Sequence, residues 1–495
     1  MGSVTKSVGY SYTNGDLTSL VTPSGQTITY SYTNHRISSI LVGSTTLLSA
    51  VTYDPFGPVT GWTWGNSSTV TRAFDEDGNP HQIVTAAVTN AYTVDNASRI
   101  TGISDSGLST DSWTFGYDTL DRVTSGTSST KSRGYTYDAN SNRLTTTGTT
   151  SSTETVSTTN NRLNSTSGGI VRTYAYDNAG NTLSYTGDTF TFNQRGRMSS
   201  ATVSAGETNY LYNAVGQLME KSGNGGTTLL MYDEAGHLLG EYTSSGALVQ
   251  ETIWMGDIPV ATLRPNGSTG CTSTVCIFYV HTDHLGSPRK VTQPSGNTLA
   301  WRWDPDTFGS VAPNSNPSGL GTFTYNLRFP GQYSLNETGL YYNYFRDYDP
   351  QVGRYIESDP IGLQAGVNTY AYVSDDPLGT VDPQGLEPQP LPWQRTRRRN
   401  CNSDETSACK AQCGNRGVES CKVSQTFRVT RTLGNGAAVY EWKDGPMSCS
   451  CKPDPSDCPT LKALAEALGV SVPVYLIISE GSRFLFPPRN LVPVP

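Results

Sequence analysis

The most regular feature of the chain is an alternation of aromatic and small polar residues that ends in an acidic residue. The pattern is Tyr-x-Tyr followed by Asp or Asn, and its clearest copy runs from Tyr135 to Leu144. Alternation with a period of two places both rings on one face of a β-strand. The Asp or Asn then hydrogen-bonds its own backbone, Gly or Asn supplies a positive φ, and a Thr-rich run follows as a second strand. The pattern therefore predicts a β-hairpin.

Copies of this unit recur at intervals of roughly 20 residues. One hairpin alone is only marginally stable, so the repeated hairpins must share a core. We therefore expect residues 1–386 to be mainly β, with less than about a tenth of them helical and with most repeat rings buried on one face. The repeat Tyr and Asp residues are expected to serve the scaffold rather than chemistry. The aromatic residues that begin the turns are Tyr12, Tyr32, Tyr53, Phe74, Tyr117, Tyr137, Tyr176, Phe192, Tyr212 and Tyr232.

Composition agrees with a β-rich protein. Only 15% of the 495 residues are charged, and 50 are Gly, whereas helical bundles and coiled coils are rich in Ala, Glu, Lys, Leu and Arg. An aromatic content of 10% argues against disorder. No run of 18 apolar residues occurs, so no membrane-spanning helix is expected. The first residues lack the apolar stretch of a signal peptide, so export would need another route or a signal on a longer parent chain.

Charge and cysteine content both change near residue 386. Residues 387–495 hold 14 Lys and Arg against 10 Asp and Glu, whereas the preceding part is strongly acidic. All five histidines lie in the preceding part. These contrasts predict a separate C-terminal domain. Seven of the nine cysteines lie in it: Cys401, Cys409, Cys413, Cys421, Cys449, Cys451 and Cys458.

A block of dense motifs replaces the repeat at residues 278–386. It begins with Tyr279-Val280-His281-Thr282-Asp283-His284-Leu285-Gly286-Ser287-Pro288-Arg289 and ends with two related turns, Asp359-Pro360-Ile361-Gly362-Leu363 and Asp382-Pro383-Gln384-Gly385-Leu386. His281, Asp283 and His284 could suggest a metal site, but hydrogen bonding at a sheet turn is favoured because no further carboxylate follows at metal-ligand spacing. No metal and no cofactor are expected.

These motifs resemble a known family. The repeats are similar to the YD repeats of Rhs proteins, of the C subunits of insecticidal Tc toxins and of teneurins, and the block at 278–386 resembles the Rhs repeat-associated core. The resemblance implies a spiral of β-hairpins that forms a hollow shell. It also implies three parts: YD repeats at 1–277, the core at 278–386, and a variable Cys-rich α+β domain at 387–495.

The resemblance further implies self-cleavage after the second Asp-Pro-x-Gly-Leu motif, at the Leu386–Glu387 bond. Peptide hydrolysis needs a base for water and an acid for the leaving amine, and two carboxylates that share a proton can supply both. Matching to the family gives Arg346, Asp347 and Asp359. Asp382 could replace one of the aspartates or hold the substrate strand. The alternative is that Asp-Pro-x-Gly segments are only turns, which is the favoured interpretation of Asp376.

The C-terminal segment carries no motif of a known enzyme. Residues 387–400, with Arg397–Arg399, are expected to form a basic linker. Strands are expected at Thr426–Thr432, Ala438–Trp442 and Val472–Ser479, and an amphipathic helix at Thr460–Leu468. Disulfides are favoured over zinc for the cysteines, because Cys-x2-Cys pairs are absent from the sequence. The segment has no histidine, which disfavours histidine-dependent nucleases and zinc deaminases.

Two classes of function fit these observations. The first is a polymorphic toxin that is secreted or delivered extracellularly and whose β-shell encloses its own C-terminal domain as cargo until aspartyl autoproteolysis frees it. Its expected partners are an immunity protein and a secretion-system or toxin-complex component; no nucleic-acid or nucleotide site is expected. The alternative is a non-enzymatic YD-repeat surface or adhesion protein. The Asp359–Leu386 block favours the first class, because an adhesive shell does not need it.

Overall fold

The computed structural model describes residues 5–54, 58–75, 77–85, 88–390, 396–413, 418–432 and 438–451. The chain divides into two compact units. The first comprises residues 1–394 and 433–437, and the second comprises residues 395–432 and 438–495. Within the described residues, no helix is long and apolar enough to cross a membrane.

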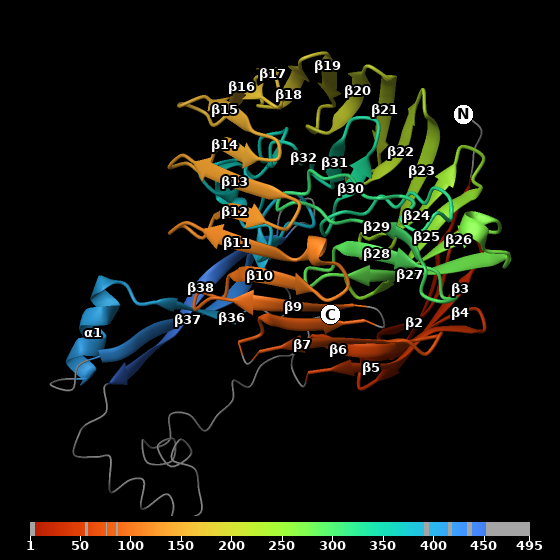
Figure 1. The fold of residues 1–495 in the computed structure, drawn as a ribbon, viewed down its shortest axis with the longest axis horizontal. Coiled ribbons are helices and arrows are strands. Elements are labelled where there is room, and N and C mark those ends of the chain that lie inside the picture. Colours follow the sequence, from red (N-terminus) through yellow and green to blue (C-terminus); the bar gives the residue numbers. More distant parts are fainter. Residues whose placement is uncertain are drawn as a thin grey trace, which may run out of the picture. The chain divides into compact units, whose positions relative to one another are not determined.

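The first unit is built on one 29-stranded sheet in which each strand pairs antiparallel with the next (Figure 1). This confirms the expected repeated hairpins. The strands are β1 (Gly9–Thr13), β2 (Asp16–Val21), β3 (Thr27–Thr33), β4 (Arg36–Val42), β5 (Thr45–Tyr53), β6 (Val59–Trp64), β7 (Thr69–Phe74), β8 (Pro80–Val84), β9 (Thr89–Val94), β10 (Ile100–Asp105), β11 (Trp113–Tyr117), β12 (Val123–Thr127), β13 (Ser132–Tyr137), β14 (Arg143–Gly148), β15 (Ser152–Val156), β16 (Leu163–Gly168), β17 (Arg172–Tyr176), β18 (Thr182–Tyr185), β19 (Asp188–Phe192), β20 (Met198–Val203), β21 (Gly206–Tyr212), β22 (Leu218–Gly223), β23 (Gly226–Tyr232), β24 (Leu238–Thr243), β25 (Leu248–Met255), β26 (Ile258–Pro265), β27 (Val275–Thr282), β28 (Pro288–Thr292) and β29 (Leu299–Arg302). Single 3-10 turns η1 (Ser109–Asp111) and η2 (Ser268–Gly270) interrupt the connections.

The hairpin of β13 and β14 shows how the repeat works. Asp138 Oδ1 accepts hydrogen bonds from the backbone N–H groups of Asn140 and Asn142, each at 2.9 Å. The Tyr137 hydroxyl donates to the carbonyl oxygen of Val123 at 2.6 Å, which ties one repeat to the one before it. The same backbone cap recurs at Asp95, Asp118 and Asp283, and the same tyrosine contact at Tyr53, Tyr117, Tyr176 and Tyr212.

The two rings differ in burial in several repeats. The first ring is buried, as in Tyr30, Tyr92 and Tyr135, which are 7%, 7% and 5% exposed. The second ring, as in Tyr137, is half-buried because one face meets the preceding repeat. The expected burial of most repeat rings was wrong for the ring that begins each turn, which is half-buried or, for Tyr12 at the first edge of the sheet, 51% exposed.

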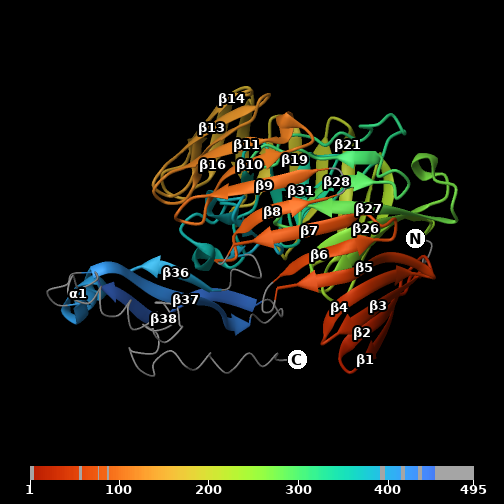
Figure 2. The same ribbon diagram turned by 60° about the horizontal axis from the view of Figure 1, so that its bottom comes forward.

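The long sheet curls until its first strands meet its last ones (Figure 2). Leu20, Ile28 and Ile40 of the early strands share one hydrophobic core with Ile253 and Leu263 of β25 and β26. At the same seam, Trp64 stacks on Tyr279, with ring centroids 4.3 Å apart. This closure buries apolar side chains from both ends of the sheet.

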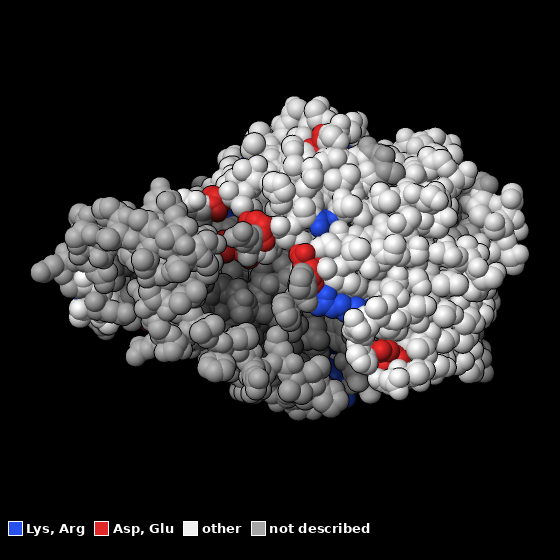
Figure 3. Space-filling view, turned by 90° about the horizontal axis from the view of Figure 1, so that it is seen from below, with Lys and Arg blue, Asp and Glu red and all other residues white. Residues whose placement is uncertain are grey.

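Residues 303–386 occupy the interior of the curled sheet (Figure 1). They contain a small antiparallel sheet of β30 (Tyr333–Leu335), β31 (Leu340–Asn343), β32 (Arg346–Asp349) and β33 (Arg354–Tyr355). Two 3-10 turns, η3 (Gly362–Ala365) and η4 (Val373–Asp375), precede a short pair, β34 (Thr380–Val381) and β35 (Gln389–Pro390). This interior segment holds the whole of the candidate site. Charged side chains are sparse on the described part of the surface in Figure 3, in keeping with the low charge content.

The second unit contains β36 (Thr396–Asn400), α1 (Ser403–Cys413), β37 (Val418–Thr432) and β38 (Ala438–Cys451). The strand pair expected at Thr426–Thr432 and Ala438–Trp442 lies within β37 and β38. The linker assignment of Arg397–Arg399 was wrong, because this backbone forms β36 and pairs with β37. The helix and strand expected beyond residue 459, and Cys458, lie outside the described residues.

Cysteines of the second unit are partly cross-linked. Cys401 and Cys421 form a disulfide with each other. Cys409 and Cys413 of α1 each take part in a disulfide as well. Cys449 and Cys451 lie on β38. The first unit contains a disulfide that the sequence did not suggest, between Cys271 and Cys276.

Candidate active site

Arg346 is the centre of a buried charged cluster around the expected scissile bond. It lies on β32, and only 3% of it is exposed. Its Nη2 lies 2.7 Å from Asp359 Oδ2 and 3.4 Å from Asp382 Oδ2, so one nitrogen contacts both carboxylates. The two aspartates are therefore brought to the same nitrogen, and this shared cation favours the ionised form of each.

The same guanidinium also holds the backbone that would be cut. Arg346 Nε donates to the carbonyl oxygen of Gly385 at 2.6 Å, and Nη2 approaches the carbonyl oxygen of Leu386 at 3.4 Å. The Leu386 carbonyl belongs to the Leu386–Glu387 bond. A cation at this oxygen can stabilise the negative charge that develops there when water attacks the carbonyl carbon.

Asp382 is oriented by two donors. Its Oδ1 accepts the backbone N–H of Leu386 at 2.9 Å, and its Oδ2 accepts the hydroxyl of Tyr355 at 2.7 Å. Burial raises the pKa of Asp382, while Arg346 and these hydrogen bonds oppose that rise. The carboxylate is thus fixed beside the residue that precedes the scissile bond.

Asp359 is held by one backbone donor and by the Arg346 cation. Its Oδ1 accepts the N–H of Ile361 at 2.9 Å, as in an Asp-Pro turn. Burial raises the pKa of Asp359 to about 7, because the desolvation of its charge outweighs the attraction of Arg346. A carboxyl with this pKa can carry a proton near neutral pH.

The segment that contains the expected scissile bond is a tight turn between β34 and β35. Gly385 adopts φ +65°, and a Cβ at this position would lie 2.3 Å from the carbonyl oxygen of Asn343. Only glycine fits both the conformation and the space. Gly331 also packs against this turn, because a Cβ at Gly331 would lie 2.1 Å from the carbonyl oxygen of Pro383. Leu386 is 6% exposed, so the bond lies inside the fold.

The structure does not bring Asp347 to this bond, which corrects its expected pairing with Asp359. Arg346 and Asp347 are neighbours on β32, so their side chains point to opposite faces. The carboxyl of Asp347 instead pairs with Glu357, whose Oε2 also accepts the Asp347 backbone N–H at 2.8 Å. Asp359 and Asp382 are the two aspartates that meet at Leu386.

The other motif residues have local partners. Asp376 Oδ1 accepts the N–H groups of Leu378 and Gly379 at 3.3 and 3.2 Å, as the turn interpretation requires. His281 faces Thr292, and His284 faces the carbonyl oxygen of Leu378 at 2.8 Å. These contacts are those of a sheet turn.

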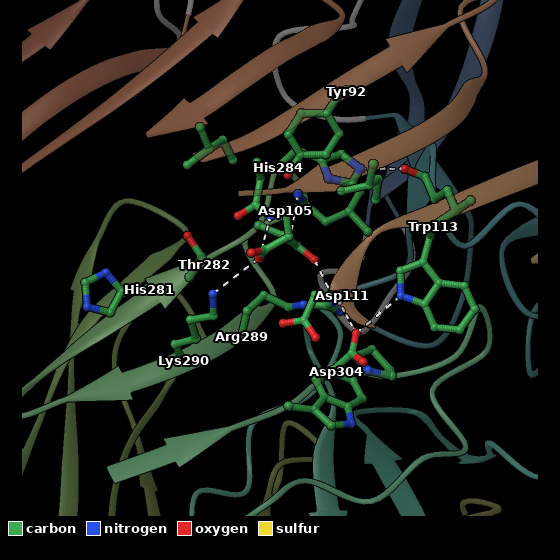
Figure 4. Close-up of a pocket in the computed structure, with 18 of the residues that line it drawn as sticks. Tyr92, Asp105, Asp111, Trp113, His281, Thr282, His284, Arg289, Lys290 and Asp304 are labelled. Carbon is green, nitrogen blue, oxygen red and sulfur yellow. Dashed lines mark hydrogen bonds and ion pairs between the residues drawn. The ribbon is translucent and has the colours of Figure 1, made fainter. Parts of the chain in front are cut away.

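The histidines line a pocket of about 80 Å³ between β8–β11 and β27–β28 (Figure 4). Its acidic groups are already paired: Asp105 with Lys290, and Asp304 with Lys131 and Arg289. Leu386 is not among the lining residues. This pocket is therefore separate from the candidate site.

Tyr355 and Asn343 are site residues that the motif analysis did not assign. Both lie within the dense block, but neither is a conventional acid, base or nucleophile. Asn343 Nδ2 donates to the Tyr355 hydroxyl at 2.7 Å and to the carbonyl oxygen of Asp382 at 2.9 Å. The one available signal that Asp359 and Asp382 lie together was that each begins an Asp-Pro-x-Gly-Leu motif.

Family models match two parts of the chain. A teneurin YD-shell model matches residues 87–237, and an RHS protein model matches residues 277–315. These two parts of the chain are similar to YD-repeat and Rhs proteins. The first match covers repeated hairpins, and the second covers the last strands of the 29-stranded sheet and the first residues of the interior segment.

Curated relatives of this chain include toxins. It is 46% identical over 110 residues to the double-stranded DNA deaminase toxin A of Burkholderia cenocepacia, and 44% identical over 110 residues to the toxin protein Tse5 of Pseudomonas aeruginosa. Each match covers 22% of this chain and 8% of the relative. The relatives are therefore much longer than the matched segment.

A solved structure of the Photorhabdus luminescens Tc holotoxin pore is also similar. The match has a TM-score of 0.65 at 18% identity and covers 77% of this chain and 21% of the other chain. At this identity the likeness concerns the fold: a curled YD-repeat shell.

Proposed function

We propose that this protein is a self-cleaving toxin shell that cuts its own Leu386–Glu387 bond and releases residues 387–495 as an effector. The observation that carries the proposal is the contact of one Arg346 nitrogen with Asp359, Asp382 and the Leu386 carbonyl oxygen. Two buried carboxyls, a cation and a held peptide bond are the parts that aspartyl hydrolysis needs.

The reaction follows from these positions. One carboxylate of the pair takes a proton from water, whose oxygen attacks the carbonyl carbon of Leu386, and Arg346 stabilises the resulting oxyanion. The other carboxyl gives its proton to the nitrogen of Glu387 as the C–N bond breaks. The products are a carboxylate at Leu386 and an amine at Glu387. The enzyme turns over once, on itself.

Toxin relatives support the assignment of the released segment as an effector. The composition break at residue 386 supports it independently, since the tail differs in charge and cysteine content from the shell. The Tc holotoxin likeness supports delivery outside the producing cell with a toxin-complex or secretion-system partner, and a toxin of this kind requires an immunity protein in its producer.

The test is the cleavage of single-residue variants of the full chain. Wild-type chain should give two fragments, with Glu387 as the first residue of the small one. Asp359→Asn and Asp382→Asn should each leave the chain whole, because an amide neither accepts nor donates the proton as a carboxyl does. Proline as the new first residue would instead indicate acid lability of Asp-Pro bonds, and cutting in both variants would reject the aspartate pair.

Asp347→Asn is the matched control. An asparagine side chain can still hydrogen-bond Glu357, and it lies on the face of β32 that points away from Leu386. Cleavage at the wild-type rate is expected. A block in Asp347→Asn, with normal cutting in Asp382→Asn, would restore the pairing first expected from the sequence.

A further inference from the structure

We propose that Tyr355 is a positioning residue of the cleavage site, which holds the Asp382 carboxylate with its hydroxyl and the Arg346 guanidinium with its ring. This inference rests on the proposed self-cleavage. It adds a residue that lies outside both Asp-Pro-x-Gly-Leu motifs.

The hydrogen-bond direction around Tyr355 is fixed by its neighbours. Asn343 Nδ2 can only donate, so the Tyr355 oxygen accepts from it at 2.7 Å. The phenol proton then remains for Asp382 Oδ2, 2.7 Å away. An amide, a phenol and a carboxylate thus form one directed chain, in which Tyr355 is 1% exposed and Asn343 fully buried.

The ring of Tyr355 supports the cation of the site. The guanidinium carbon of Arg346 lies 3.6 Å from the ring centroid, within the range of a cation–π contact. The ring on one side and the Gly385 carbonyl oxygen at Nε restrain the guanidinium. Its Nη2 is thereby kept at both aspartates and at Leu386.

The groups that face Asp382 come from four elements. They are Arg346 of β32, Tyr355 of β33, Asp359 of the first Asp-Pro turn, and the ring of Tyr372, which precedes η4. Among them, Tyr355 donates a neutral hydrogen bond to the ionised form of Asp382, which lowers its pKa. Loss of this hydroxyl should therefore raise the pKa of Asp382.

The experiment measures cleavage after refolding of uncut chain from guanidinium at a series of pH values. Tyr355→Phe keeps the ring under Arg346 and removes only the hydroxyl. We expect cleavage to slow by about 10- to 100-fold, as for a misplaced catalytic group. We also expect the acidic limb of the rate profile to move to higher pH, because a carboxyl with a raised pKa, here that of Asp382, loses its proton at a higher pH.

Tyr348→Phe is the matched control, because it removes a fully buried hydroxyl that donates to the Phe308 carbonyl oxygen at 2.9 Å in the same aromatic cluster. It should cleave with the wild-type profile. A wild-type profile in Tyr355→Phe, or equal slowing in both variants with no shift of the acidic limb, would overturn the inference.

Asn343→Ala decides the outcome if Tyr355→Phe does not refold, as judged by circular dichroism. It removes the donor to the phenol oxygen and leaves the ring intact. A shift of the acidic limb in the same direction would support the positioning role, and an unchanged limb would overturn it. Asp359→Asn runs in the same series: cutting in that variant would reject the proposed self-cleavage itself, whatever Tyr355 does.

Discussion

At the scale of residues, the interior holds two acid pairs with different partners. Asp359 and Asp382 both form ion pairs with Arg346, whereas Asp347 lies beside Glu357, which accepts its backbone N–H. Burial raises the pKa of Asp347 to about 6, and burial with the charge of Asp347 raises the pKa of Glu357 well above its usual range. The direction of both shifts favours a proton on this pair, mainly on Glu357.

This second pair should make stability depend on pH. Because both folded-state pKa values are raised, the folded chain binds more protons than the unfolded chain from about pH 4 upward. The free energy of unfolding should therefore fall as pH rises through about 6. Glu357→Gln removes one of these titrations and the repulsion between the two charges, so it should flatten the fall.

Guanidinium titrations at pH 5 and pH 8 check this, with Asp359→Asn as the uncut background for both chains. The difference between the two pH values should be smaller in Glu357→Gln than in the background. An equal or larger difference would show that the pair does not share a proton.

A single repeat tyrosine should carry substantial stability. Tyr137 packs half-buried in its hairpin, donates to Val123, and lies under Arg122 with the guanidinium carbon 4.7 Å from the ring centroid. Tyr137→Ala should lower the free energy of unfolding by about 3 kcal/mol, as for other large-to-small changes. Leu120→Ala, at a position that is 62% exposed, should change it by less than about 0.5 kcal/mol. Denaturant titration distinguishes the two, and equal effects would mean that the repeat ring is not a packing element.

At the scale of elements, two turns of the same sequence type allow a clean comparison. Gly385 and Gly362 occupy the same place in the two Asp-Pro-x-Gly-Leu motifs, with φ +65° and +63°. A Cβ at Gly385 would meet the Asn343 carbonyl oxygen at 2.3 Å, whereas one at Gly362 would meet nothing within 4 Å. Backbone strain is thus equal, and only the packing differs.

Gly385→Ala should therefore abolish cleavage, because the turn can no longer lie against β31 and Leu386 moves from the aspartates. In Gly362→Ala, cleavage should be slowed but not abolished, since this variant has the backbone strain of a positive φ but no steric clash. Gel analysis of both refolded variants measures this. Equal cutting in the two variants would mean that the close approach of Gly385 to Asn343 does not position the bond.

The elements were predictable from the sequence where their causes are local. The Asp138 cap and the Tyr-x-Tyr strand of β13 depend on residues a few positions apart, and both appear as expected. The choice of Asp382 over Asp347 depends on which face of β32 looks toward Leu386, and the strand pattern alone does not orient that face. Asn343 and Tyr355 were missed because their roles arise only when three distant segments meet. Arg397–Arg399 were misassigned because pairing with β37 overrides their linker-like composition.

At the scale of the whole molecule, the first unit consists of a wall, which is the curled 29-stranded sheet, and an interior segment, residues 303–386. The two parts depend on each other. The interior segment is fastened to the wall by polar contacts, such as Tyr370 with the Gly180 carbonyl oxygen at 2.8 Å and Thr182 with the Ile356 carbonyl oxygen at 2.7 Å. These contacts flank the strand and turn that carry Tyr355 and Asp359. The charged cluster at Leu386 therefore forms only when the surrounding sheet is folded. Chain that is kept in guanidinium should stay uncut.

The burial of the site should also confine the reaction to one chain. Asp359, Asp382 and Leu386 are 4%, 1% and 6% exposed, and the backbone N–H of Leu386 donates a hydrogen bond to Asp382 Oδ1 of the same turn. A second chain would have to displace that turn to reach the aspartates. Mixing cleaving wild-type chain with uncut Asp359→Asn chain during refolding should therefore leave the variant whole, and the wild-type rate should not change with protein concentration. A longer, tagged Asp359→Asn chain makes the two substrates separable on a gel. Cutting of the tagged chain, or a rate that rises with concentration, would show that the site opens to a substrate from another molecule.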